Sequence, residues 1–180
     1  MRIVGGEARG RTLRSVPGDS TRPTADRVRQ SLFDVLGQRC DGLVVLDLYA
    51  GTGALALEAV SRGAAAATLV EHDAKACDAI RANLEALRYG GRCTLLRDDV
   101  GRALRRLRGP FDLVFSDPPY ALRAAQATLL AVLPLLAPGA RVVLEMDRRE
   151  PLPQGCEVVD DRLYGDTRVL IVRAPAAAPG

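Results

Sequence analysis

The sequence has few of the residues that build metal sites and disulfide frameworks. Its four cysteines, Cys40, Cys77, Cys93 and Cys156, are separated by 37, 16 and 63 residues and include no CxxC pair. His72 is the only histidine. Zinc sites need several cysteine or histidine ligands at close spacing, and small disulfide frameworks need paired cysteines. Neither is indicated, and we predict no metal site.

Long apolar runs are absent as well. No stretch approaches the roughly 18 residues that span a bilayer, and the initial residues MRIVGGEARGR lack the apolar core of a signal peptide. With 48% hydrophobic and 26% charged residues, the composition is that of a soluble globular protein. We therefore expect a cytoplasmic, monomeric protein of one main domain, with no membrane partner.

Lysine is nearly absent, since 24 of the 25 basic residues are arginine. Residues 1–39 contain eight arginines against four acids, a net charge of +4, so with +3 for the whole chain residues 40–180 sum to −1. Arginine binds phosphate through two parallel N–H groups, so this Gly/Arg-rich fifth of the chain predicts a nucleic-acid partner. The alternative is that the arginine-rich composition raises every local count.

From Leu43 onward, short apolar runs alternate with helical patterns. The apolar runs are residues 43–48, 67–71, 93–97, 111–117 and 140–146, and the helical patterns are residues 54–61, 74–87, 100–107 and 121–136. Pro138 and Gly139 are interpreted as the stop signal of the last helix. Nearly continuous apolar strands between helices predict a parallel sheet covered on both faces, which is a doubly wound α/β domain.

Both ends of the chain depart from this rhythm. Residues 156–163 and 168–173 flank the short loop YGDT, so they predict an antiparallel hairpin, typical of a methyltransferase-like sheet rather than a plain dinucleotide-binding one. Residues 2–14 predict a small hairpin. The expected organisation is a basic extension (1–39), a main domain (40–174) and a disordered tail (175–180).

An amphipathic helix is expected to begin near Thr24, which we take as its N-cap. Its polar face should carry Arg27 and Arg29. Its apolar face should carry Val28, Leu32, Val35 and Leu36.

The first candidate site is the segment DLYAGTGAL, which follows the first strand. Gly51 and Gly53 allow a tight turn that approaches a ligand closely, and the next helix starts with free N–H groups directed at it. Asp47 would repel a pyrophosphate but suits a cationic or amino-bearing ligand. Ala56 replaces the last glycine of the dinucleotide motif GxGxxG, and a purely structural turn is the alternative. The cofactor-binding residues predicted here are Asp47, Tyr49, Ala50, Gly51, Thr52 and Gly53.

Acidic residues follow the next two strands. Glu71 can accept hydrogen bonds from both ribose hydroxyls of a nucleoside. After the third strand, Asp98 or Asp99 can meet an adenine amino group; we favour Asp99, for which a plain helix cap is the alternative. His72, expected at the surface, and Val100 complete the predicted cofactor contacts.

The motif DPPY, residues 117–120, follows the fourth strand. Ligands of open α/β sheets lie beyond the carboxyl ends of the strands where the strand order reverses, so DPPY and the glycine turn should share one crevice. Asp117 and the carbonyl of Pro118 can accept hydrogen bonds from an exocyclic amine, Pro119 keeps the corner rigid, and Tyr120 can stack on the base.

The chemistry expected at this corner is methyl transfer. Two acceptors draw the amine nitrogen toward a tetrahedral form, and a methyl sulfonium held by the glycine turn then makes the reaction a matter of positioning. A base in a duplex would first have to flip out of its stack.

With these residues the chain resembles the RsmD family of RNA methyltransferases. The similar segments are RIVGGEARGR, RPTADRVRQSLFDVL, LDLYAGTGALALEAVSRGA, DPPY and YGDTRV. The resemblance implies a class I, Rossmann-like methyltransferase fold with a seven-stranded, mostly parallel sheet, and S-adenosyl-L-methionine as the methyl donor. It implies methylation of N2 of a guanine in 16S ribosomal RNA, with that RNA or a small-subunit assembly particle as partner.

The resemblance also implies roles for particular residues. Asp117, Pro118 and Tyr120 would clamp the target amine, while Thr24 and Arg27 would lie near the methionine end of the donor. The residues implied to face RNA are Arg9, Arg11, Arg22 and Arg29.

Other functions stay open at this point. A DNA adenine-N6 methyltransferase would use the same corner, but 180 residues leave no room for a separate target-recognition domain. Protein glutamine methylation usually has Asn in place of Asp117. A non-catalytic RNA-binding module with this fold and an NAD-dependent oxidoreductase are the alternatives of a different class.

Overall fold

Seven strands form a single sheet in the order β3-β2-β1-β4-β5-β7-β6. The computed structural model describes residues 1–16, 23–118 and 124–175, with only the backbone of residues 23–25. Strands β1 to β5 pair in parallel, and β7 pairs antiparallel with both β5 and β6. The strands are β1 (Val44–Leu48), β2 (Ala66–Glu71), β3 (Cys93–Arg97), β4 (Phe111–Ser116), β5 (Leu136–Asp147), β6 (Glu157–Tyr164) and β7 (Thr167–Arg173). The predicted parallel sheet with a C-terminal antiparallel hairpin is confirmed.

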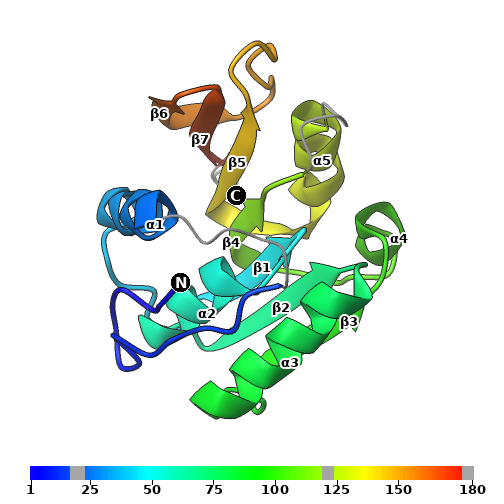
Figure 1. Ribbon diagram of the computed structural model, residues 1–180. Helices are drawn as coiled ribbons and strands as arrows, with labels where there is room; N and C mark the ends of the chain where they lie inside the picture. Colours follow the sequence, from blue (N-terminus) through cyan, green and yellow to red (C-terminus); the bar gives the residue numbers. More distant parts are fainter. Residues whose placement is uncertain (17–22, 119–123, 176–180) are drawn as a thin grey trace.

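Helices cover both faces of this sheet (Figure 1). They are α1 (Pro23–Val35), α2 (Ala54–Ser61), α3 (Ala74–Leu87), α4 (Val100–Leu104), α5 (Ala125–Val132) and the short 3-10 helix η2 (Leu133–Leu135). Side chains of α1, α2 and α3 share one hydrophobic cluster with the sheet, and those of α4 and α5 share another. The fold is therefore a three-layer α/β/α sandwich.

The strands alternate between these two clusters. On β1, Val45 belongs to the cluster under α2 and α3, while its neighbour Leu46 belongs to the cluster under α4 and α5. Successive strand side chains point to opposite faces, so a strand between two helical layers must be apolar on both sides. Each fully buried leucine contributes roughly 1.5–3 kcal/mol, which explains the nearly unbroken apolar runs.

The N-terminal segment packs on the C-terminal end of α2. The predicted hairpin of residues 2–14 is short: one antiparallel bridge joins Arg2 and Thr12, and the backbone N–H groups of Ile3 and Leu13 donate across it to Arg11 and Met1 at 2.9 and 3.0 Å. At its turn, the backbone N–H of Glu7 donates to the carbonyl of Ser61 at 2.7 Å, and that of Ala8 to its Oγ at 2.9 Å. Ile3, fully buried, anchors the segment in the same cluster as α1. The division at residue 40 stays a prediction.

Some predicted boundaries are wrong. Helix α1 begins at Pro23, so Thr24 lies in its first turn rather than at the N-cap. Helix α4 ends at Leu104, three residues early, and α5 is described only from Ala125. Pro138 lies inside β5, where the register between β4 and β5 shifts. Such an irregularity accommodates the N–H that proline lacks, so no helix stop is needed there.

The described residues contain four free cysteines, and Cys40, Cys77 and Cys93 are buried. Within residues 1–16, 23–118 and 124–175, no helix is long and apolar enough to cross a membrane. Over the same residues, no group of three or more His, Cys, Asp or Glu side chains is arranged to hold a metal ion.

Candidate active site

Three carboxylates meet at the carboxyl ends of adjacent strands. Asp47 on β1 lies in register with Leu69 of β2 and Phe115 of β4. Glu71 ends β2, and Asp117 directly follows β4. The predicted meeting of the glycine turn with the start of DPPY is therefore present in the described part of the site.

The glycine turn has a backbone that few side chains tolerate. Tyr49, Gly51 and Gly53 have φ angles of 60°, 56° and 78°. A Cβ atom at Gly53 would lie 2.9 Å from Cδ2 of Leu69, closer than packed carbon atoms approach. The left-handed conformation of Tyr49 costs roughly 1 kcal/mol or more, and such strain is concentrated at functional sites. Such a turn would allow a ligand to approach the backbone closely.

Glu71 holds this turn in place. Its Oε2 accepts the backbone N–H of Gly51 at 2.8 Å, and its Oε1 accepts those of His72 and Asp73, also at 2.8 Å. A carboxylate has about four acceptor positions, so one is left for a ligand hydroxyl. His72 is exposed, and its Nδ1 lies 3.2 Å from Oε1 of Glu71.

The crevice raises the pKa of two of its carboxyl groups. Burial raises the pKa of Asp47 to about 7, and the charges of Asp117 and Glu71 add to this, although the N–H of Ala56 donates to Oδ2 at 3.1 Å. Part of Asp117 is exposed, yet the protein around its carboxyl group desolvates it and raises its pKa to about 6. Close carboxylates in a desolvated crevice favour a positively charged ligand.

The raised pKa of Asp47 predicts a pH-dependent stability difference. At pH 5 Asp47 is protonated in the folded protein, whereas at pH 8 the fold must bury its charge. Asp47→Asn should therefore gain stability relative to wild type as the pH rises from 5 to 8. Urea unfolding of both proteins at the two pH values measures this, and an unchanged difference would contradict it.

The side chains of Asp98 and Asp99 have different partners. Asp98, with a side chain 11% exposed, forms ion pairs with Arg102 and Arg106. Asp99 caps α4, its Oδ1 accepting the N–H of Arg102 at 3.1 Å, and it is exposed. This arrangement favours Asp99 as the freer acceptor. Val100 is 6% exposed and belongs to the cluster under α4.

Asn83 contacts the glycine turn and was not predicted from the sequence. Its Oδ1 accepts the backbone N–H of Arg14 at 2.6 Å, and its Nδ2 donates to the carbonyls of Arg14 and Thr52 at 3.2 and 3.0 Å. One buried amide thus joins the N-terminal segment to the glycine turn. An asparagine on the apolar side of the helix at 74–87, beside Ile80 and Leu84, was the available signal.

The remaining predicted residues divide into three groups. Pro118 is buried, while Arg9, Arg11 and Arg27 are exposed. Pro119, Tyr120 and Arg22 lie outside the described residues, as does the side chain of Thr24.

The prediction that Arg29 lies on a polar helix face is wrong. Its side chain is 5% exposed and pairs with Asp26 at 2.9 Å and with Glu58 at 3.4 Å. It also donates to the backbone carbonyl of Arg2. A guanidinium committed to these partners inside the protein is not available to RNA.

The sheet order, the glycine turn after β1 and the carboxylate after β4 define a class I S-adenosylmethionine-dependent methyltransferase fold. A model of the family described as "Conserved hypothetical protein 95" matches residues 1–173. The chain belongs to this family, the RsmD family.

Individual relatives agree with this assignment. YlbH of Bacillus subtilis (strain 168) is 39% identical over 185 residues, covering 96% of this chain and 98% of its own. Ribosomal RNA small subunit methyltransferase D of Escherichia coli (strain K12) is 37% identical over 155 residues, covering 85% and 78%. The solved structure of yhhF from Escherichia coli superimposes with a TM-score of 0.88 at 31% identity, covering 98% of each chain.

Proposed function

We propose that this protein transfers a methyl group from S-adenosyl-L-methionine to the exocyclic N2 amine of a guanine in small-subunit ribosomal RNA. The observation that carries the proposal is the meeting of the glycine turn, Asp47 and Asp117 at the carboxyl ends of β1 and β4. The Escherichia coli relative, by name a small-subunit ribosomal RNA methyltransferase, supports the RNA substrate.

The residues of the crevice fit the proposed donor. The turn at Gly53 leaves no space for a side chain, and the buried Asp47 carboxylate beside it suits a cationic ligand. In this proposal Asp47 and the turn (Tyr49, Ala50, Gly51, Thr52) bind the methionine end, Glu71 the ribose and Asp99 the adenine, with Thr24, Arg27, His72 and Val100 nearby. The donor, when bound, supplies an electrophilic methyl group.

The DPPY corner would orient the amine and receive its proton. Asp117 and the carbonyl of Pro118 accept its two N–H groups, which fixes the nitrogen lone pair in one direction. Formation of the new N–C bond leaves the nitrogen with an excess proton. Asp117, whose pKa is raised to about 6 by desolvation, is a stronger base than an ordinary carboxylate and can pass the proton to water at its exposed side.

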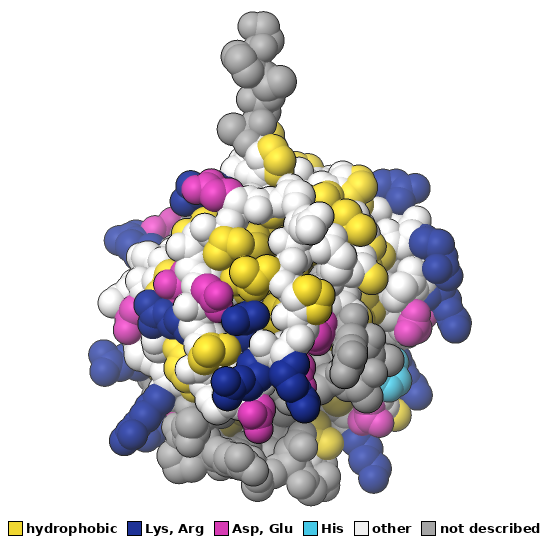
Figure 2. Space-filling view, turned by 90° about the horizontal axis from the view of Figure 1, so that it is seen from above, with side chains coloured by type: hydrophobic (Ala, Val, Ile, Leu, Met, Phe, Trp, Pro, Cys, Tyr) yellow, Lys and Arg dark blue, Asp and Glu magenta, His cyan; other side chains and the backbone are white. Residues whose placement is uncertain are grey.

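The surface is compatible with an RNA partner. Figure 2 shows Lys and Arg side chains at both sides of one face and in a group toward its lower centre, with acidic side chains among them. The proposed working form is a cytoplasmic monomer that binds ribosomal RNA or a small-subunit assembly particle, for which a flipped guanine is the accessible target.

The direct test is incubation with labelled S-adenosyl-L-methionine and ribosomal RNA or small subunits from cells that lack the enzyme. Label is expected at N2 of one guanine, located by mapping the modified base. Label in DNA adenine instead, binding of NAD in place of the donor, or RNA binding without any transfer would each contradict the proposal.

A further inference from the structure

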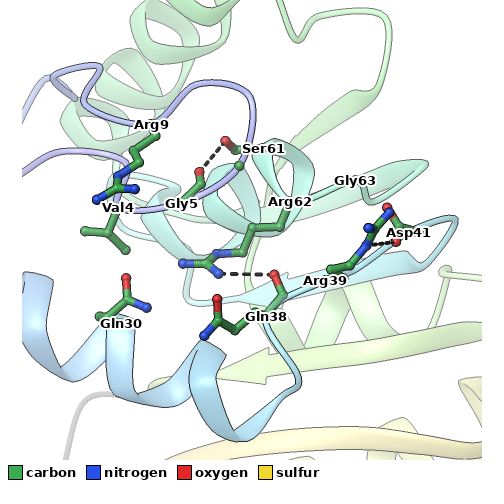
Figure 3. Close-up of a pocket in the computed structure, with 11 residues that line it drawn as sticks. Val4, Gly5, Arg9, Gln30, Gln38, Arg39, Asp41, Ser61, Arg62 and Gly63 are labelled. Atoms are coloured by element: carbon green, nitrogen blue, oxygen red, sulfur yellow. Dashed lines mark hydrogen bonds and ion pairs between the residues drawn. The ribbon is translucent and has the colours of Figure 1, made fainter.

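A second polar pocket lies at the amino-terminal ends of β1 and β2, whereas the carboxylates lie at the carboxyl ends. Asp41, which precedes β1, and Gly63, which precedes β2, both line it, together with Ser61 and Arg62 at the C-terminal end of α2. The N-terminal segment and α1 form its other walls (Figure 3). Its volume is about 810 Å³, which is typical of a pocket that binds a ligand.

Three arginines lie along this pocket. Figure 3 shows Arg9 at one end, Arg39 with Asp41 at the other, and Arg62 between them. Arg39 pairs with Asp41 at 2.5 Å, but both side chains are mostly exposed, at 81% and 56%, so an incoming anion can compete for the arginine. Asp41 is the single acidic residue among the lining residues.

The middle arginine, Arg62, is held by hydrogen bonds inside the protein. Glu58 accepts Nε of Arg62 at 2.8 Å, and the carbonyl of Gln38 accepts Nη1 at 3.1 Å. Nη2 is buried and has no hydrogen-bond partner among the described residues. Glu58 balances the charge of Arg62, and Nη2 is packed against Gly5, so the exposed guanidinium groups of Arg9 and Arg39 are the ones that an anionic ligand can reach.

The walls offer further groups suited to a nucleic acid. Gln30 and Gln38 carry amides that donate and accept, as base edges and sugar hydroxyls require. Figure 3 shows Gln30 directed across the pocket toward Arg9. Gly5, Gly6 and Gly63 let the walls pack closely, because a Cβ atom at these positions would collide with Arg62, Ser61 and Asp41. The pocket is rigid, because Oγ of Ser61 donates to the carbonyl of Gly5 at 2.6 Å and accepts the N–H of Ala8.

We infer that this pocket binds the phosphate backbone of the RNA substrate at a distance from the reacting base. The inference rests on the proposed function and extends it. Helix α2, with 8 residues, separates the glycine turn from the pocket by about 12 Å. At about 3.4 Å per nucleotide of a duplex strand, this corresponds to about three to four nucleotides. The enzyme would therefore contact a structured RNA at both the amino-terminal and the carboxyl ends of its strands.

The pocket also distinguishes Arg9 from Arg11, although both were predicted from the sequence to face RNA. Arg9 lines it, whereas Arg11 is not among the lining residues and donates instead to the carbonyl of Ala86 at 2.7 Å. Both are exposed. A site-specific contact predicts unequal effects at these two positions, while general attraction to RNA predicts equal ones.

The test compares two double variants of the full chain with equal changes in charge. Arg9→Gln with Arg39→Gln alters the pocket; Arg11→Gln with Arg81→Gln alters exposed arginines outside it. Binding of a small-subunit rRNA fragment is measured by fluorescence anisotropy over a range of salt concentrations. The pocket variant should lose about tenfold or more in affinity, with a salt slope shallower by about 1 to 2, and the control should lose much less.

Equal losses in the two double variants would overturn the inference. A difference seen with assembled small subunits but not with naked RNA would assign the pocket to a ribosomal protein and would also overturn it. Donor affinity, measured by calorimetry, should be unchanged in both. Failure of the wild type to methylate any RNA would contradict the proposed function instead, and the binding comparison would still report on the pocket.

Discussion

Asp117→Ala is expected to lower the rate of methyl transfer by at least about two orders of magnitude while donor affinity stays nearly unchanged. In the proposed mechanism Asp117 accepts a proton of the target amine and later receives it, so the side chain acts on the nucleophile and not on the donor. Loss of one preorganised polar contact at a reacting group commonly costs 10²–10³ in rate. Single-turnover transfer from labelled donor measures the rate, and calorimetry measures donor affinity.

Asp117→Asn distinguishes the two proposed roles of this side chain, which are to accept a hydrogen bond from the amine and to take up its proton. The amide oxygen can still accept a hydrogen bond, but it cannot take up a proton at neutral pH. We expect activity between that of wild type and Asp117→Ala. Because the wild-type pKa of Asp117 is raised to about 6, its transfer rate should fall as the pH drops below 6, and this acidic limb should be missing in the Asn variant.

A matched control is Asp78→Ala, which removes an exposed carboxylate from α3 that pairs with Arg81. It should leave both the rate and its pH dependence unchanged. A transfer rate in Asp117→Ala equal to that of this control would remove the carboxylate from the mechanism.

The sheet could be predicted because its signals are local and repeated. A strand buried on both faces needs apolar side chains on both, and the runs at β1, β2 and β4 satisfy this without interruption. In open parallel sheets, ligand-binding residues lie at the carboxyl ends of the strands. The sequence alone therefore predicted that Asp47, Glu71 and Asp117 lie close together. The register of β1 with β2 and β4 supports that placement.

The wrong predictions concern residues whose burial or pairing depends on a partner that is distant in the sequence. On α1, Arg27 and Arg29 are equivalent by charge, yet only Arg29 is buried, because Glu58 lies opposite it on α2. The turn of the N-terminal segment also depends on a distant partner, because the backbone N–H groups of Glu7 and Ala8 donate to Ser61 at the end of α2. A lone glutamate in the apolar stretch ALALEAVS and an asparagine on the apolar face of α3 were the signals available.

Residues that reach a proposed site only through distant contacts are not found by motifs. Asn83 belongs to no motif, but it joins the glycine turn to Arg14. Arg39 and Gln38 follow α1 without a recognisable pattern, and only the folded chain brings them beside Arg9 in the second pocket. Charge counting correctly marked the N-terminal segment as basic, but it could not tell exposed arginines from buried ones.

Glu58→Gln is expected to lower the free energy of unfolding by about 3–5 kcal/mol, because it removes the charge that two buried arginines share. Glu58 is fully buried; its Oε1 accepts Nε of Arg62 at 2.8 Å, and its Oε2 accepts the N–H of Val4 at 2.9 Å and Nε of Arg29 at 3.4 Å. The glutamine side chain has nearly the same volume, so the change tests charge rather than packing. It would also direct an N–H group at one of the guanidinium groups or at Val4.

Glu85→Gln on the exposed face of α3 is the matched control and should change the free energy of unfolding by less than about 0.5 kcal/mol. Urea denaturation followed by circular dichroism measures both variants. Glu58 connects the first residues and α1 to α2, so limited proteolysis of Glu58→Gln should cut the N-terminal segment first. A loss below about 1 kcal/mol would mean that Asp26 and backbone carbonyls already compensate Arg29 and Arg62, and that the extension is held on the sheet by Ile3, Leu13 and Phe33 alone.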